Sequence, residues 1–114
     1  MLTVFGIKQC DTVKKALKWL DTNDVAHQFH DVRKDGLTAE MIQRWIAAFD
    51  WEMLVNKRST TWRNLDTKAK ETLGPDNIVS VLLENPTLIK RPIVEGGNKP
   101  LIGFKEDDYQ ANLL

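Results

Sequence analysis

Residues 2–20 read LTVFGIKQCDTVKKALKWL and combine a short apolar run, a glycine and an amphipathic stretch. The run Leu2–Phe5 is short and apolar, and the glycine after it is typical of a strand that ends in a tight loop. Beyond the loop, apolar residues recur on one helical face, at Val13, Ala16, Leu17 and Leu20. The stretch therefore predicts a strand over about Leu2–Phe5 and a helix over about Thr12–Thr22, with Cys10 at the junction between them.

Cys10 is the only cysteine of the chain, and its position predicts a reactive thiol. It lies at or just before the start of the helix, where the partial positive charge of the helix end favours thiolate over thiol. Lys8 and Lys14 add positive charge nearby, whereas the Asp11 carboxylate favours the neutral thiol. We expect the sum to bring the Cys10 pKa below the value of about 8.5 for a free cysteine. The alternative is that Cys10 is a small buried hydrophobic residue.

The composition is that of an ordinary globular domain, with 114 residues, 42% of them hydrophobic and 28% charged. Sixteen basic and sixteen acidic residues cancel, so no excess charge favours nucleic acid or a membrane surface as a partner. No apolar stretch approaches the roughly 20 residues that span a bilayer, and no secretory leader is recognisable. A single cysteine excludes an internal disulfide and a cysteine-rich zinc site. We therefore expect a cytoplasmic protein without a bound metal.

The rest of the chain carries strand signals at both ends and helix signals in the middle. Residues 26–32 predict a second strand, which completes a βαβ unit and hence a parallel pair. The patterns then predict helical segments at 38–49 (capped by Thr38), 51–55, 66–74 (capped by Asp66) and 76–85, with a polar, basic loop at 56–64. The end of the chain predicts strands at 88–95 and 101–104, joined by a hairpin loop, and a last helix at 105–114.

This order of elements predicts the fold class. A βαβ half, a helical insertion over about 38–86 and a ββα half give an α/β protein with a mixed, four-stranded sheet flanked by helices. This is the thioredoxin topology with helices inserted between its two halves. We expect residues 1–114 to form a single thioredoxin-like domain.

Five segments spread along the chain carry a recognisable pattern: GIKQCDTVKKA (6–16), FHDVRKDGL (29–37), NKRSTTWRNL (56–65), IKRPIV (89–94) and LIGF (101–104). Together they resemble the arsenate reductase-related (ArsC/Spx) family. Within it they are most similar to the YffB-like subgroup, bacterial proteins proposed to be glutathione-dependent thiol reductases. The resemblance covers essentially the whole chain and implies a thioredoxin-like fold with a helical insertion.

The resemblance also implies a site. Cys10 matches the nucleophilic cysteine of the family, and Arg91 matches an arginine that helps to bind an oxyanion or glutathione. Pro92 resembles the cis-proline that faces the active-site cysteine in thioredoxin-like folds. From the residues alone, Thr12 can cap the first helix and can also donate its hydroxyl to the thiolate, and Lys8 is a weaker candidate for the same pocket. Without the resemblance, Arg91 reads as a solvated charge at the start of a strand.

The chain departs from the arsenate reductase pattern at three places. Asn56 stands where one arginine of the oxyanion site is expected, with Arg58 or Arg63 of the basic loop as its substitute. Gly103 stands near the position of another arginine, and Gly6 stands near that of a histidine before the cysteine. An arsenate pocket depends on several charged, two-pronged donors. These departures argue against arsenate as the substrate.

Two functions remain possible at this level. The first is a thiol reductase with a single nucleophilic cysteine, using glutathione or a glutaredoxin as its partner and acting on a small-molecule or protein disulfide. The second is a non-enzymatic module that resembles the Spx regulators and docks on a protein such as RNA polymerase. Spx regulators carry the motif Cys-x-x-Cys. In this chain Val13 stands at the place of the second cysteine, so an internal disulfide switch is excluded.

Overall fold

A mixed sheet of four strands forms one part of the protein in the computed structural model, which describes residues 1–114. The strand order is β2-β1-β3-β4. The strands are β1 (Leu2–Gly6), β2 (His27–Asp31), β3 (Ile93–Glu95) and β4 (Leu101–Ile102). The central strand β1 is parallel to β2 and antiparallel to β3, and β3 is antiparallel to β4.

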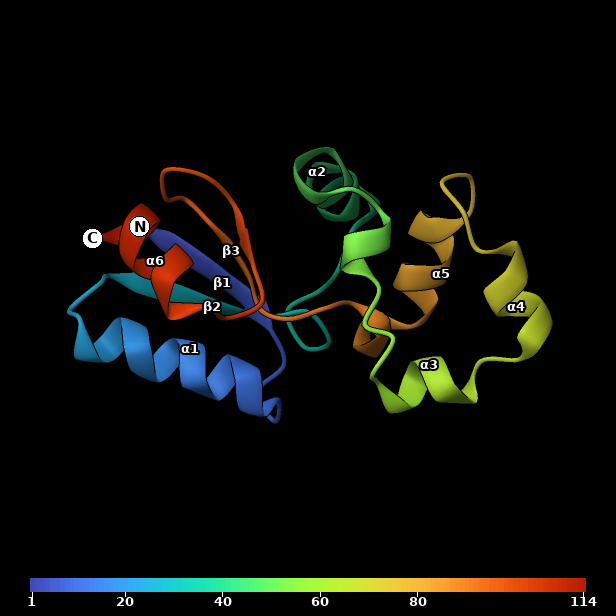
Figure 1. Ribbon diagram of the computed structural model, residues 1–114, viewed down its shortest axis with the longest axis horizontal. Coiled ribbons are helices and arrows are strands. Elements are labelled where there is room, and N and C mark those ends of the chain that lie inside the picture. Colours follow the sequence, from blue (N-terminus) through green and yellow to red (C-terminus); the bar gives the residue numbers. More distant parts are fainter. The chain divides into compact units, whose positions relative to one another are not determined.

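Two helices pack on one face of this sheet (Figure 1). They are α1 (Asp11–Thr22), which forms the crossover between β1 and β2, and α6 (Glu106–Leu113) near the end of the chain. Alternate residues of the strands meet buried residues of both helices in a shared core, made of Leu2, Val4, Ala16, Leu20, Val94, Leu101 and Tyr109. The arrangement is a thioredoxin-like α/β fold and confirms the predicted fold class.

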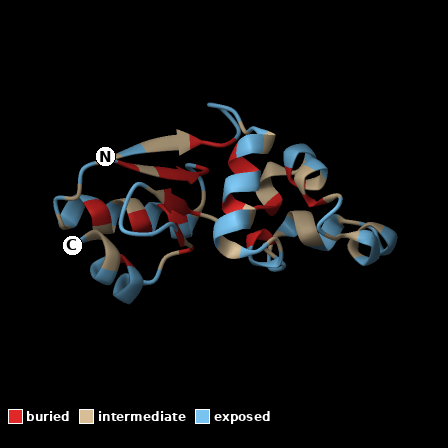
Figure 2. Cartoon of the chain, turned by 90° about the horizontal axis from the view of Figure 1, so that it is seen from above, coloured by how far each residue is buried: buried red, intermediate tan, exposed pale blue.

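Residues 37–90 form a second compact unit, separate from the unit of residues 1–36 and 91–114. Its elements are α2 (Ala39–Phe49), η1 (Glu52–Leu54), α3 (Thr60–Asn64), α4 (Thr67–Thr72), α5 (Ile78–Glu84) and η2 (Pro86–Leu88). Helix α2 packs against α5, and fully buried residues of this unit include Ile42, Trp45, Leu54, Ile78, Leu82 and Leu88. Figure 2 shows the buried parts of the chain in red. The helical middle of the chain thus has a core of its own.

Local capping explains where the short helices begin. Thr38 and Asp66 accept hydrogen bonds from the amides of Met41 and Ala69, as the sequence predicts. Ser59 does the same for α3 by accepting from the Trp62 amide at 3.1 Å. The expected loop 56–64 is therefore wrong in its second half, because the Ser59 cap starts a helical turn there.

The expected strand 88–95 is also wrong in its first half. The apolar run is divided between two cores: Leu88 and Ile89 are buried within the 37–90 unit, whereas Ile93 and Val94 belong to the sheet. Pro86 begins a 3-10 turn, and Ile89 forms only an isolated bridge with Val55. The last strand is likewise shorter than expected and ends at Ile102, because Gly103 adopts a positive φ of 75°.

Backbone hydrogen bonds join the segment around Val55 to the last residues of the 37–90 unit. The Asn56 amide donates to the Leu88 carbonyl at 2.8 Å, and the Lys90 amide donates to the Leu54 carbonyl at 2.7 Å. No helix of the protein is both long enough and apolar enough to cross a membrane.

Candidate functional site

Cys10 is the N-cap residue of α1. Its backbone is extended, with φ −79° and ψ 123°, and its carbonyl accepts the first helical hydrogen bond from the Lys14 amide at 3.0 Å. The Cys10 amide in turn donates to the Ile7 carbonyl at 3.1 Å, which closes the turn that follows β1. The half-buried thiol therefore belongs to the residue that starts the helix, where the first amides have no acceptor within the helix.

Arg91 and Pro92 reach the same end of the sheet through strand β3. Because β3 is antiparallel to β1, with Phe5 opposite Ile93, the residues just before Ile93 lie beside the end of β1 and the loop that carries Cys10. The peptide bond between Arg91 and Pro92 is cis, as the resemblance implies. Arg91 is half-buried and Pro92 is buried.

The surroundings of Cys10 lower its pKa. Partial burial of the thiol raises the pKa, but four favourable interactions outweigh it. These are the amide of Val13, a hydrogen bond from the Arg91 side chain, the positive charge of Arg91 and the amide of Thr12. The Cys10 side chain makes no capping hydrogen bond of ordinary geometry, so the amides act on the sulfur as oriented dipoles. The arrangement favours the thiolate, which is the nucleophilic form of a cysteine.

Two hydrogen bonds connect Pro92 through Gly103 to Tyr109 of α6. The Gly103 amide donates to the Pro92 carbonyl at 2.8 Å, and the buried Tyr109 hydroxyl donates to the Gly103 carbonyl at 2.7 Å. Tyr109 also packs edge-on against Trp19 and Phe104. Helix α6 thereby holds the segment that presents Arg91. This role of Tyr109 carries no signal in the sequence, since only the folded chain brings residue 109 near residue 92.

A tight turn after β2 lies next to the Cys10 loop. The Asp31 carboxylate is buried and accepts hydrogen bonds from the amides of Arg33 at 2.8 Å and Lys34 at 3.1 Å. Burial raises the pKa of Asp31, but these amides and the two positive charges lower it overall. The Arg33 guanidinium donates to the Gln9 side chain at 3.4 Å, which links the turn to the residue before Cys10.

The other residues singled out from the sequence lie at three different places. Thr12 is not the N-cap, because α1 begins at Asp11 and Cys10 caps it, and only the Thr12 backbone amide acts on the sulfur. Lys8 is exposed in the loop before Cys10. Arg58 and Arg63 belong to the 37–90 unit, and both are exposed. Arg58 lies in a turn closed by Asn56, whose side chain accepts a hydrogen bond from the Arg58 amide at 3.1 Å.

The site offers a thiol, a guanidinium and backbone amides but no set of metal ligands. The protein has no group of three or more His, Cys, Asp or Glu side chains arranged to hold a metal ion. What the site can hold is an anion next to a sulfur nucleophile.

Residues 5–112 match the model of the ArsC family. The chain belongs to this family. A protein from Haemophilus influenzae, described as uncharacterized, is 57% identical over 111 residues, which cover 97% of each chain. A solved structure named YffB superposes with a TM-score of 0.94 at 41% identity over 100% of both chains.

A regulator is also among the relatives. The "global transcriptional regulator Spx" of Streptococcus mutans is 29% identical over 115 aligned positions, which cover 99% of this chain and 83% of the regulator. The chain thus belongs to the ArsC family and is also similar to an Spx regulator, as the five segments implied.

Proposed function

We propose that this ArsC-family protein is a thiol reductase that uses Cys10 as its single nucleophile and glutathione as its reductant. The observation that carries the proposal is the pairing of a helix-capping thiol with the Arg91 guanidinium, which together lower the Cys10 pKa. A thiolate held next to a fixed positive charge is suited to attack a disulfide that carries an anionic group.

The reaction consists of two thiol–disulfide exchanges. In the first, the Cys10 thiolate attacks the glutathione sulfur of a mixed disulfide; a sulfur–sulfur bond forms at Cys10, and the substrate leaves as a thiolate that takes up a proton. In the second, the thiolate of another glutathione attacks the glutathione sulfur bound to Cys10, which releases oxidised glutathione and restores the Cys10 thiolate. One mixed disulfide and one glutathione are consumed, and one free thiol and one oxidised glutathione are formed.

Arg91 orients the glutathione in this proposal. Its planar guanidinium can donate two parallel hydrogen bonds to a carboxylate, whereas a lysine in its place offers only a point charge. Pro92 follows Arg91 in the chain and is buried. The Thr12 amide also lowers the pKa of the Cys10 thiol.

The test compares wild type with Arg91→Lys, Arg91→Ala and Cys10→Ser. The pH dependence of iodoacetamide alkylation measures the Cys10 pKa, and intact mass after incubation with oxidised glutathione measures the mixed disulfide. We expect Arg91→Lys to keep most of the thiolate stabilisation but to form the mixed disulfide more slowly, and Arg91→Ala to lose both. Cys10→Ser is the control that gains no mass. Equal behaviour of wild type and both Arg91 variants would refute the role of Arg91.

Arsenate is not the substrate we expect. The resemblance implies two further arginines in an arsenate site, and this chain has Asn56 near the place of one and Gly103 near the place of the other. Each missing charge-assisted hydrogen bond to an oxyanion costs about 1.5–3 kcal/mol, so two can lower the rate by a factor of about 100 or more. A coupled assay with glutathione, glutaredoxin and arsenate should give little turnover. Robust turnover would indicate that Arg58 or Arg63 completes the site.

A regulatory function is the second candidate, because Spx regulators align with 99% of the chain. In that case the protein binds a partner such as RNA polymerase, and Cys10 takes no part in a reaction. The alkylation experiment separates the two functions: an inflection at or above about 8.5 means a thiol that is not activated. That result would remove the physical basis of the reductase and favour the regulator.

A further inference from the structure

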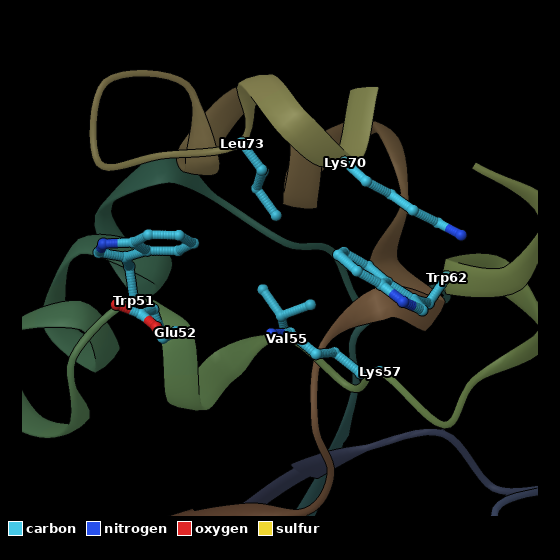
Figure 3. A pocket seen from close by; sticks show the side chains of 7 residues that line it. All are labelled: Trp51, Glu52, Val55, Lys57, Trp62, Lys70 and Leu73. Atoms are coloured by element: carbon cyan, nitrogen blue, oxygen red, sulfur yellow. The ribbon is translucent and has the colours of Figure 1, made fainter. Parts of the chain in front are cut away.

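A slot between two tryptophans opens on the surface of the 37–90 unit. Figure 3 shows the rings of Trp51 and Trp62 on opposite sides of it, with Leu73 above and Val55 below. Trp51 precedes η1, Trp62 lies in α3 and Leu73 follows α4, so three short elements build the slot. None of its lining residues belongs to the site of Cys10 and Arg91, which lies in the other unit.

The walls of the slot are apolar, but its rim carries an uneven distribution of charge. The ammonium groups of Lys57 and Lys70 lie 5.7 and 5.3 Å from the centre of the Trp62 ring. Glu52 lies at the other side, below Trp51 (Figure 3). The end at Trp62 is therefore positive, the end at Trp51 is negative, and the three charged groups sum to +1.

The size of the slot limits what can occupy it. Its cavity volume is about 80 Å³, whereas sites for cofactors and drug-sized molecules usually have roughly 300–1,000 Å³. A single apolar side chain fits a space of this kind. Pockets lined by tryptophan that receive one side chain of a partner are typical of the centres of protein–protein interfaces.

We propose that this slot binds an acidic peptide segment of another protein, which inserts one apolar side chain between Trp51 and Trp62. Carboxylates next to the inserted residue pair with Lys57 and Lys70, and Glu52 repels them from the other end. The charge distribution thereby sets the direction of the segment as well as its acidic character.

The test uses uniformly ¹⁵N-labelled full-length protein and the indole N–H signals of its four tryptophans. The probe is an acetylated, amidated heptapeptide with a central leucine flanked by aspartates. We expect saturable shifts of the signals of Trp51 and Trp62. Trp45, which is 1% exposed, and Trp19, which lies in the other unit, should stay in place and serve as internal references.

Two control peptides separate the parts of the proposal. In one, serine replaces the leucine, and in the other, lysines replace the aspartates. Both should shift the Trp51 and Trp62 signals far less at the same concentration. If all three peptides shift them equally, or if the acidic peptide shifts nothing at millimolar concentration, the proposal is wrong.

Charge variants of the protein test the rim. Lys57→Gln combined with Lys70→Gln should weaken the acidic peptide about threefold to tenfold, since each exposed ion pair is worth little by itself. Glu52→Gln should strengthen its binding. Lys68→Gln is the matched control, because Lys68 lies exposed on α4 but does not line the slot, and it should change nothing. Equal weakening by Lys68→Gln would contradict the proposal.

A second copy of the chain is the competing occupant. Dilution of the protein without any peptide distinguishes it. If the Trp51 and Trp62 signals move on dilution, the slot is filled by another copy and the proposal of an acidic partner is overturned. If they stay in place, the slot is free to receive the peptide.

Discussion

Gly6 stands where strand β1 ends, four residues before the thiol, and no side chain fits there. A Cβ at this position would lie 2.8 Å from Cγ2 and 3.3 Å from Cγ1 of Val13, and 3.6 Å from Cε1 of Phe29. Carbon atoms in contact prefer about 3.5–4.0 Å. Val13 is fully buried in the first turn of α1, and its branched side chain has few rotamers, so it cannot swing away.

We therefore predict that Gly6→Ala destabilises the protein through overpacking. Insertion of a methyl group into a full core costs about 1–3 kcal/mol. For a domain of this length, about 4 °C of melting temperature corresponds to each kcal/mol, so the melting temperature should fall by about 4–12 °C. The backbone of Gly6 has no positive φ, so the loss comes from contact with Val13 rather than from backbone strain.

The same substitution should affect the thiol. The Val13 amide is one of the groups that lower the Cys10 pKa. If the new methyl group pushes the first turn of α1 outwards, this amide moves away from the sulfur, and the inflection of alkylation against pH should move upwards from that of wild type.

A double-mutant cycle with Val13→Ala tests the reasoning. Val13→Ala alone should cost about 2 kcal/mol by removing buried methyl groups, but it also makes room for a side chain at position 6. The double variant should then be more stable than the sum of the two single changes by about 1 kcal/mol or more, measured by urea unfolding. Additivity within about 0.5 kcal/mol would refute the contact between Gly6 and Val13 as the cause.

Two further predictions concern groups that support the site. Tyr109→Phe removes the hydroxyl that donates to the Gly103 carbonyl and leaves this buried acceptor without its partner. The free energy of unfolding, measured in urea, should therefore fall by about 1–2 kcal/mol. An unchanged midpoint would show that the hydrogen bond does not contribute to stability. Asp31 has a lowered pKa in the folded protein, so its contribution to stability is present above the unfolded value of about 3.9 and is lost as the pH falls through the folded value. Asp31→Asn keeps an acceptor for the amides of the turn but cannot titrate, and its unfolding free energy should therefore fall less steeply below about pH 5 than that of wild type.

The elements of the fold that local patterns specify were predictable from the sequence. The period of apolar residues in α1 and α2 and the caps Thr38 and Asp66 define helices through contacts within a few residues. The order of strands and helices then leaves few topologies, because a βαβ unit crosses over with one hand. The position of Cys10 at the start of a helix follows from the same local pattern.

Local patterns failed where one apolar run serves two cores. Residues 88–95 read as a continuous strand, yet Leu88 and Ile89 are buried in the 37–90 unit and Ile93 and Val94 in the sheet. The core that lies nearest in space decides where each apolar residue is buried. The spacing of apolar residues along the chain does not show which core that is. In the same way, the Ser59 cap converted the end of a polar loop into α3.

The fold class, the family and the thiol at the helix start were all predictable from the amino-acid sequence, since each depends on residues that are close in the chain or on a pattern along it. The resemblance implied that Arg91 and Cys10 share a site, but the folded chain supplied the contact between them. The hydrogen bond from Tyr109 to Gly103, and the slot formed by Trp51, Trp62 and the two lysines, were visible in the folded chain alone. These contacts join residues that are far apart in the chain, and their geometry depends on how strands pair and how helices pack. The electrostatics of the thiol arises from both: the helix start is local, and the guanidinium beside it is a consequence of the antiparallel pairing of β1 and β3.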